Sequence, residues 1–312
     1  MSEPVLVAEQ LRLAVGGTTA TAELDLRTRG DRVALAGDAG SLLGVLFGTR
    51  APGASPEGHL ARAPVRVVGG TLRLLGADVG RGEHHALAGL APLDPPLPGR
   101  WTVEEYLVAG ARLGGVGARQ ARSAAAATLE RLGLGAARKR VLRGAQRAER
   151  RAVVIAQAVV TEPQVLVAEA PLGGLEPRAA AFVLEVLRRA TAGRAAVLSF
   201  ARVLPPGPES ELTATATDLC WLGAGRLLLH AEPREVLTGA RCLELTVAAN
   251  ADGLRQELSA LGIRLEGGPQ HFLVVMPPKQ DAARGEALSV TTVLAAAARA
   301  RAPVVRCVPA MA

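Results

Sequence analysis

The sequence predicts an α/β domain with a largely parallel sheet, followed by a small α+β module. Two short runs, the wholly apolar 165–168 and the mostly apolar 195–199, are typical of buried parallel strands. Helical patterns flank these runs, as the crossover connections of a parallel sheet require. Near residue 240 the predicted order changes to strand, helix, strand, strand, helix, strand, which is the order of a ferredoxin-like module. We therefore expect two domains, at 1–240 and 241–312.

The first part of the chain is predicted to be rich in strands. Apolar and polar residues alternate at 5–13 and again at 22–27, and a more apolar segment follows at 32–36. The stretch at 49–63 is rich in Pro, Gly and Ser and predicts a loop. Two further strands are expected after it, at 64–68 and 71–75.

The middle of the chain is predicted to be mainly helical. Thr102 is a candidate N-cap, because Glu105 follows three residues later as in a capping box. Further helical patterns lie at 117–132, 147–160 and 178–191.

The predicted C-terminal module has six elements. A strand at 243–247 precedes a helix at 252–261, and two strands joined by Gly267-Gly268-Pro269 come next. A helix and a last strand complete the order. The paired strands and the last two elements are expected at 263–266, 272–276, 285–301 and 303–308.

Composition favours a cytoplasmic protein. Hydrophobic residues make up 49% of the 312 residues, but no apolar run is long enough to span a bilayer. The N-terminus lacks a signal-peptide pattern. The cysteines, Cys220, Cys242 and Cys307, are odd in number and widely spaced, which predicts neither a disulfide framework nor a zinc site.

The positive charge does not predict nucleic-acid binding. The formal net charge is +7, but the arginines are dispersed and the one tight basic run is Arg138-Lys139-Arg140. Aromatic residues make up 2% of the chain, too few for a base-stacking platform. A nucleic-acid-associated regulator is the weakest of three functional hypotheses, and no nucleic-acid partner is expected.

A strand, a glycine turn and an apolar helix run from 32 to 48. A phosphate-binding P-loop has the pattern G-x-x-x-x-G-K-[ST], in which the lysine contacts phosphates and the hydroxyl binds magnesium. Here Gly37 and Gly40 are followed by Ser41 and then by Leu42-Leu43-Gly44-Val45. The chain has only two lysines, Lys139 and Lys279, so this turn has no lysine.

Three later segments, taken in order, resemble the ATP-binding subunit of an ABC transporter, particularly the exporter type with a small C-terminal domain. Residues 91–107 resemble the Q-loop and the helix after it, and 161–177 resemble the Walker B strand and D-loop. Residues 220–237 resemble the end of the catalytic domain. The resemblance implies an ABC-type, P-loop-like nucleotide-binding domain with a ferredoxin-like appendage.

At each chemical position, this sequence departs from the family. The resemblance places Val15 where an aromatic residue stacks on adenine, and Leu93 where a glutamine senses phosphate and metal. It places Glu169 at the Walker B aspartate, Ala170 at the general base and Ala201 at the switch histidine, with Arg202 next. The expected vestigial nucleotide pocket therefore comprises Gly37, Gly40, Ser41, Leu93, Glu169, Ala170 and Ala201.

The signature segment LSGGQ, which caps a phosphate on the opposite subunit, has two candidate counterparts. An ungapped alignment gives 145–149, and a shift of three residues gives 142–146. Both lose the serine and at least one glycine.

These losses predict a catalytically inactive subunit, a pseudo-ATPase that serves a membrane transporter or envelope complex as a structural or regulatory component. The resemblance implies a membrane permease or envelope-complex subunits as partners, a cytoplasmic location at the inner face of the membrane, and leaves a homodimer open. No cofactor and no metal are expected. The alternative is a residual ATP-binding or slow ATPase subunit that uses Mg-ATP, in which Arg50, Arg62 or Arg143 replaces the lysine.

Two aromatic residues are candidates for partner docking. Trp101 and Tyr106 fall where the family's groove receives a coupling helix, although half-buried core packing explains them equally well. The neighbours His84 and His85 lack a third ligand at sensible spacing, so a surface pair is favoured over a metal site.

Overall fold

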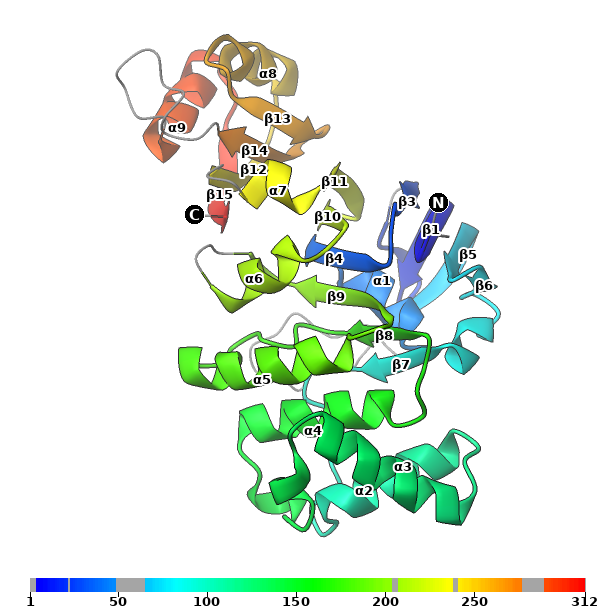
Figure 1. The fold of residues 1–312 in the computed structure, drawn as a ribbon. Coiled ribbons are helices and arrows are strands. Elements are labelled where there is room, and N and C mark those ends of the chain that lie inside the picture. Colours follow the sequence, from blue (N-terminus) through cyan, green and yellow to red (C-terminus); the bar gives the residue numbers. More distant parts are fainter. Residues whose placement is uncertain are drawn as a thin grey trace.

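The computed structural model describes residues 4–21, 23–48, 65–203, 207–237, 241–276 and 289–311. Its central sheet has six strands in the order β11-β10-β4-β9-β8-β7, parallel except for β11 at one edge (Figure 1). The strands are β4 (Arg32–Gly37), β7 (Ala88–Ala91), β8 (Val165–Ala168), β9 (Ala195–Phe200), β10 (Asp218–Gly223) and β11 (Arg226–Ala231). The buried runs expected at 165–168 and 195–199 are therefore central parallel strands, as predicted.

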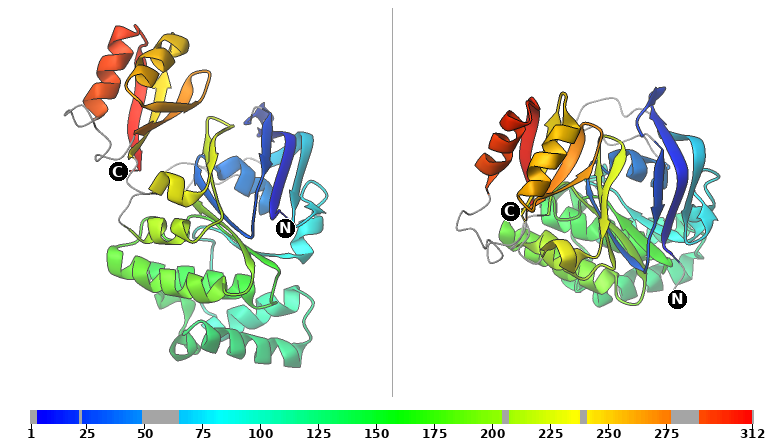
Figure 2. Two further views of the ribbon diagram at one scale, coloured as in Figure 1. Left: turned by 45° about the horizontal axis from the view of Figure 1, so that its top comes forward. Right: turned by 90° about the horizontal axis from the view of Figure 1, so that it is seen from above.

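A second, antiparallel sheet lies beside the central sheet, with the short helix α1 (Gly40–Leu46) between them (Figures 1 and 2). Its strands are β1 (Leu6–Val15), β2 (Thr18–Thr19), β3 (Leu24–Arg27), β5 (Val65–Leu74) and β6 (Ala77–Asp78). The prediction of two strands at 64–68 and 71–75 is wrong, because both belong to β5. Gly70, with φ +67°, lies opposite a register shift in β1, and this bulge lets the pairing continue.

Helices cover the other face of the central sheet. These are α4 (Arg147–Val159), α5 (Pro177–Ala190) and α6 (Pro208–Ala214), while α2 (Val103–Leu113) and α3 (Ala118–Arg131) pack beyond α4 (Figure 1). The predicted capping box of α2 is confirmed: the Glu105 N–H donates to Thr102 Oγ1, and Glu105 Oε2 accepts from the Thr102 N–H. Four short helices complete this part: η1 (Glu83–Ala86), η2 (Gly135–Ala137), η3 (Leu142–Gly144) and α7 (Pro233–Leu237).

The C-terminal module has the predicted ferredoxin-like order. It comprises β12 (Arg241–Val247), α8 (Ala251–Ala260), β13 (Arg264–Gly267), β14 (His271–Met276), α9 (Val290–Arg299) and β15 (Val304–Met311). Neighbouring strands are antiparallel in the order β13-β14-β12-β15, and both helices pack on one face. The loop predicted at 49–63, the start of the helix predicted at 285–301 and the domain boundary expected at 240 lie outside the described residues, so the boundary stays a prediction.

The second face of the C-terminal sheet packs against the first domain (Figure 2). Leu273 and Val275 of β14 join the apolar core that contains Trp221 and Leu228. Trp221 is fully buried, and its indole N–H donates to Glu244 Oε1 at 3.2 Å. The module is therefore held by shared core packing and by a polar contact.

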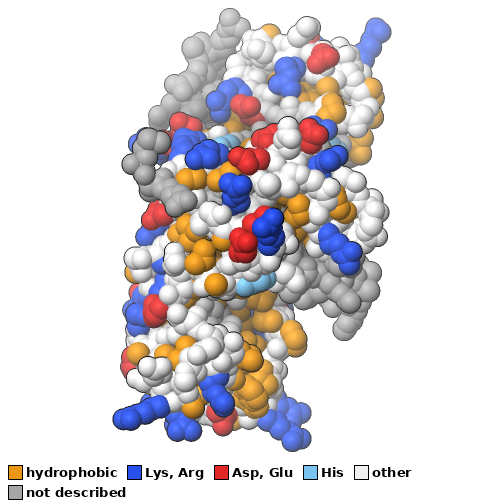
Figure 3. Space-filling model, turned by 90° about the vertical axis from the view of Figure 1, so that its right-hand side faces the viewer, with side chains coloured by type: hydrophobic (Ala, Val, Ile, Leu, Met, Phe, Trp, Pro, Cys, Tyr) orange, Lys and Arg blue, Asp and Glu red, His pale blue; other side chains and the backbone are white. Residues whose placement is uncertain are grey.

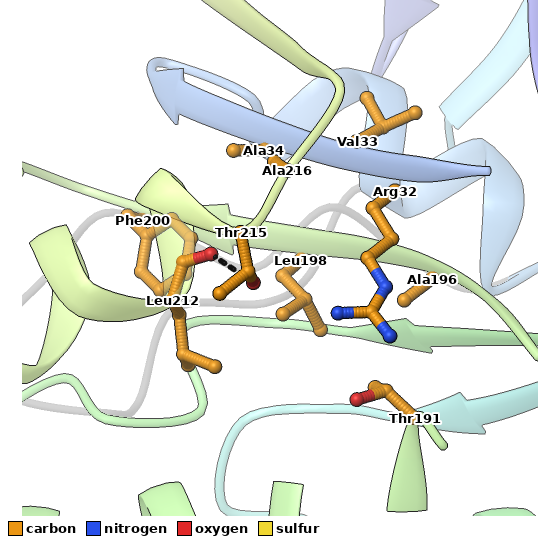
Figure 4. A pocket seen from close by; sticks show the side chains of 10 residues that line it. All are labelled: Arg32, Val33, Ala34, Thr191, Ala196, Leu198, Phe200, Leu212, Thr215 and Ala216. Atoms are coloured by element: carbon orange, nitrogen blue, oxygen red, sulfur yellow. Dashed lines mark hydrogen bonds between the residues drawn. The ribbon is translucent and has the colours of Figure 1, made fainter. Parts of the chain in front are cut away.

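The surface carries both signs of charge. On the face drawn in Figure 3, arginines and acidic residues are interspersed over most of the molecule. Among the helices that the structure describes, none is long and apolar enough to cross a membrane. A small pocket between β4, β9 and α6 has a volume of about 20 Å³ and is lined mainly by apolar side chains (Figure 4). A space of this size holds about one water molecule and cannot accept a nucleotide.

Candidate functional site

Four neighbouring parallel strands bring most of the predicted pocket residues to one edge of the sheet. Gly37 ends β4, Ala201 follows β9, and Glu169 and Ala170 follow β8. Leu93 lies two residues after β7. The carboxyl edge of a parallel sheet is where α/β proteins bind ligands, so the fold assembles these positions as the family resemblance implies.

The glycine turn after β4 is tied to strand β10. The Asp38 N–H donates to the Leu222 carbonyl oxygen at 2.8 Å, and Gly37 has φ +77°. A Cβ at Gly37 would lie 2.2 Å from that same carbonyl oxygen. The glycine is therefore required by the packing of the fold, whether or not phosphate binds beside it. Gly40 and Ser41 begin α1 and are half-buried.

Counted from Gly37, the lysine and hydroxyl positions of the P-loop pattern fall at Leu43 and Gly44, which lie in the core. Leu43 is 2% exposed and belongs to the apolar cluster that also contains Val165 and Val197 of the central sheet. Gly44, at the place of the magnesium-binding hydroxyl, is also buried. Leu43 and Gly44 therefore offer neither a cation nor a hydroxyl beside the turn, and Leu43 contributes to the apolar packing of α1.

Of the arginines considered as replacements, Arg50 and Arg62 lie outside the described residues. Arg143 lies on η3 and is exposed, and its backbone N–H donates to the Gly99 carbonyl oxygen. Arg202 lines the same cleft as Gly37. Its place next to Ala201 in the sequence did not predict this by itself.

The Walker B counterpart is engaged with the Q-loop counterpart. The Leu93 N–H donates to Glu169 Oε2 at 2.9 Å, and the Glu169 N–H donates to the Ala91 carbonyl oxygen. The Ala170 N–H donates to Ser199 Oγ at 3.0 Å. Ala170 has a methyl group where a carboxylate would activate water, so this position cannot act as a general base.

A buried arginine on α4, not singled out by the sequence, joins the loops of the site. The Arg151 guanidinium makes paired hydrogen bonds to the Asp94 carboxylate at 2.8 and 3.2 Å. It also donates to the carbonyl oxygens of Ala170 and Gly173. These bonds hold the pKa of Asp94 below its usual value, chiefly through the hydrogen bond to Arg151. An arginine within an otherwise apolar helix face was the available signal.

Both candidate signature segments meet at the start of α4. Gln146 is the N-cap, and its backbone N–H donates to Glu149 Oε2 at 3.0 Å. Arg140 forms an ion pair with the same Glu149 carboxylate. The N-cap N–H of α4 is therefore already bonded to a carboxylate of its own chain and is not available to a phosphate.

The two docking candidates differ in exposure. The Trp101 side chain is 43% exposed. Its backbone is bonded to the segment after Lys139, because the Leu142 N–H donates to the Trp101 carbonyl oxygen. Tyr106 is half-buried against the larger core, and burial raises the pKa of its hydroxyl. Of the two, Trp101 has the more accessible side chain. The expectation that His84 and His85 both lie at the surface is wrong for His84. Its side chain is buried and hydrogen-bonded to the Leu46 carbonyl oxygen.

Comparison with known proteins identifies the family. No family model matches the chain, so the identification rests on individual relatives. The daunorubicin/doxorubicin resistance ATP-binding protein DrrA of Streptomyces peucetius is 30% identical over 272 residues, covering 78% of this chain and 76% of the relative. The chain belongs to the ATP-binding proteins of ABC transporters. The daunorubicin resistance ATP-binding protein DrrA3 of Streptomyces coeruleorubidus is 31% identical over 218 residues, 66% of each chain. The Nod factor export ATP-binding protein I of Ralstonia nicotianae is 27% identical over 274 residues, 85% of this chain and 79% of the relative.

Solved structures show the same fold at lower sequence identity. The ADP conformation of MJ1267, an ATP-binding cassette of an ABC transporter, matches with a TM-score of 0.59 and 17% identity, covering 76% of this chain and 96% of that one. The protein cbiO1 from Clostridium perfringens, part of the transporter complex cbiONQ, matches with a TM-score of 0.59 and 18% identity, covering 76% of this chain and 92% of that one. The predicted family and the ABC-type fold are confirmed.

Proposed function

We propose that this protein is a catalytically inactive ATP-binding-type subunit, which serves an export transporter or envelope complex as a structural or regulatory component. The observation that carries the proposal is the burial of Leu43 in the apolar core, at the position of the phosphate-binding lysine. A charged lysine contributes most of its catalytic effect by neutralising the β- and γ-phosphates, and an alkyl side chain cannot do so.

The other losses act on separate steps of hydrolysis. Ala170 has no group that takes a proton from water, and Ala201 has none that contacts the transferred phosphate. Leu93 offers its backbone N–H to Glu169 and no side-chain ligand to a metal. Because these groups supply different parts of the rate enhancement, no single remaining contact replaces them.

The names of the relatives support a role in export. Two are described as drug-resistance ATP-binding proteins and one as a Nod factor export ATP-binding protein. By analogy, the proposed partner is an integral membrane permease or a subunit of a larger envelope complex, with this chain held at the inner face of the membrane. Trp101 and the neighbouring exposed Val141 offer an apolar contact for that partner.

The test is calorimetric titration of the full chain with Mg-ATP, together with a phosphate-release assay. We expect neither saturable heat at millimolar nucleotide nor release above the buffer rate. The variant Ala170→Glu restores a base without restoring the lysine, and we expect it to remain inactive. Turnover by the unaltered chain would overturn the proposal.

A residual ATP-binding subunit is the second candidate, favoured by Arg202, which borders the same cleft as Gly37 and Asp38. An arginine can pair with a phosphate in place of a lysine. Under this candidate, Mg-ATP binds saturably and Arg202→Gln weakens its affinity at least tenfold, the loss of a charge-assisted hydrogen bond. The distant exposed Arg122→Gln on α3 is the matched control.

A further inference from the structure

A cleft of about 640 Å³ separates the glycine turn from the C-terminal sheet. Its first wall contains Gly37 and Asp38 at the end of β4, Arg202 after β9, and the turn between β10 and β11. Its second wall is formed by β12, β14 and β15. Small-molecule sites are clefts of roughly 300–1,000 Å³ and often lie between domains, so this cleft has the size and place of a ligand site.

The C-terminal wall presents a row of polar groups. Thr246 pairs in register with His271 on one side and with Arg306 on the other, so the three lie across neighbouring strands. The Oγ1 atom of Thr246 is 3.1 Å from Nδ1 of His271, which fixes the orientation of the ring. Because cross-strand partners share a face of the sheet, this row faces the cleft together.

One arginine of the cleft is available to pair with an anion. Within the described part of the chain, Arg202 is exposed and makes no hydrogen bond or ion pair. Of the two acids, Glu244 already accepts from the Trp221 indole and lies 3.6 Å from the Arg306 guanidinium. Asp38 is the remaining acid, so the two acids and two arginines of the lining balance in formal charge, and Arg202 is the arginine that has no ion pair with a described residue.

Apolar side chains line the rest of the cleft. Val305 of β15 is 69% exposed there, although its side chain is apolar. Ala201 and Ala224, which are exposed, contribute further apolar surface. An exposed apolar surface beside convergent polar groups is typical of a site for a ligand with an apolar body.

We propose that this cleft binds an organic anion with an apolar body, whose charge lies against Arg202 and Arg306 and whose body lies on Val305. The site goes beyond the proposed function and does not depend on it, because none of these contacts needs the lost ATP-handling groups. A ligand held here bridges the first domain and the C-terminal module next to the glycine turn.

The test uses anilinonaphthalene sulfonate, a fluorescent probe with an apolar body and one negative charge, and the full chain under native conditions. We expect one saturable site. Arg202→Gln and Arg306→Gln each weaken the affinity about tenfold, the usual effect of losing a charge-assisted hydrogen bond. Val305→Asp also weakens it, through charge repulsion.

The matched controls are Arg122→Gln on α3 and Leu113→Asp on α2, both exposed and remote from the cleft. They are expected to keep the unaltered affinity. Thermal unfolding checks that each variant is folded, and Val305→Asp serves alone if either arginine variant is not. Equal affinity in all variants, or equal loss in the controls, would overturn the proposal.

Competition with Mg-ATP separates the two proposals. We expect ATP to leave the probe bound. Displacement of the probe by ATP would mean that the cleft belongs to a nucleotide site, which overturns the separate anion site. Hydrolysis of ATP without displacement would instead contradict the proposed function and leave the cleft proposal supported.

Discussion

At the scale of single residues, Gly37 separates what the fold requires from what nucleotide chemistry requires. Its backbone is left-handed and lies against the Leu222 carbonyl oxygen, so a side chain is excluded for reasons of packing alone. Leu43, six residues later, has no such constraint from the turn and has joined the core. A surviving motif glycine is therefore weak evidence for phosphate binding, whereas the fate of the lysine position is informative.

The packing requirement at Gly37 can be measured. Gly37→Ala should lower the free energy of unfolding by about 3 kcal/mol or more, because left-handed strain of about 1–2 kcal/mol adds to overlap with a backbone carbonyl. Gly193→Ala is the matched control, since Gly193 has φ +72° but nothing within 4 Å of its Cβ position. It should cost only about 1 kcal/mol. Equal costs in urea unfolding would contradict the account.

Arg151 is the second residue whose role can be tested. Arg151→Met leaves the Asp94 carboxylate and the Ala170 carbonyl oxygen without their donor. We expect a loss of about 2–4 kcal/mol, below the range for a fully buried pair because Asp94 is 41% exposed and can be rehydrated. The neighbouring Arg150→Met should change the unfolding free energy by less than about 0.5 kcal/mol. A similar loss in both variants would show that the destabilisation does not come from the contacts of Arg151 with Asp94 and Ala170.

At the scale of elements, ion pairs hold the start of α2 against the loop before α4. The Glu104 carboxylate accepts from Arg138 and from Lys139, which together hold its pKa at about 2. The basic run at 138–140 therefore has partners within its own domain, with Arg140 paired to Glu149. This structural role explains a cluster that composition alone could have assigned to nucleic acid.

The fastening predicts a specific pH dependence. The pKa of Glu104 is lower in the folded chain than its unfolded value of about 4.3. The ionised side chain therefore contributes fully to the free energy of unfolding above that pH, and this contribution is lost progressively as the pH falls toward 2. With exposed partners we expect about 1 kcal/mol at pH 7. In urea unfolding, Glu104→Gln should be less stable than the unaltered chain at pH 7, and the gap should narrow by about half at pH 3. The exposed Glu23→Gln should show no gap at either pH; a gap that widens in acid would contradict the assignment.

The sequence predicted elements better than it predicted contacts. Periodicity located β8 and the capping box of α2, because a buried strand and a helix start depend on local residues. Periodicity wrongly divided β5 into two strands, because a glycine bulge looks like a turn in the local sequence. Only the pairing with β1 shows that the strand continues through the bulge. Arg151 and Ser199 escaped notice, since their roles depend on loops that are distant in sequence.

At the scale of the whole molecule, the C-terminal module shares a core with the first domain. Leu273 of β14 is fully buried in the same apolar cluster as Trp221, whereas Leu254 of α8 lies in the module's own core. The Trp221 indole also donates to Glu244 across this boundary. We therefore expect the two parts to unfold together, as parts that share buried apolar surface usually do.

Tryptophan fluorescence can test this coupling, because the chain has two tryptophans and Trp221 lies at the boundary. In a Trp101→Phe background, the urea transition seen by Trp221 should coincide with the transition seen by circular dichroism. Leu273→Ala should shift both together by about 2–5 kcal/mol, the cost of a cavity in a core. Leu254→Ala should do the same if folding is cooperative, although its side chain does not contact the first domain's core. A Leu254→Ala variant whose module unfolds first, with the Trp221 transition unchanged, would mean that the module folds on its own and that the shared core is only a docking surface.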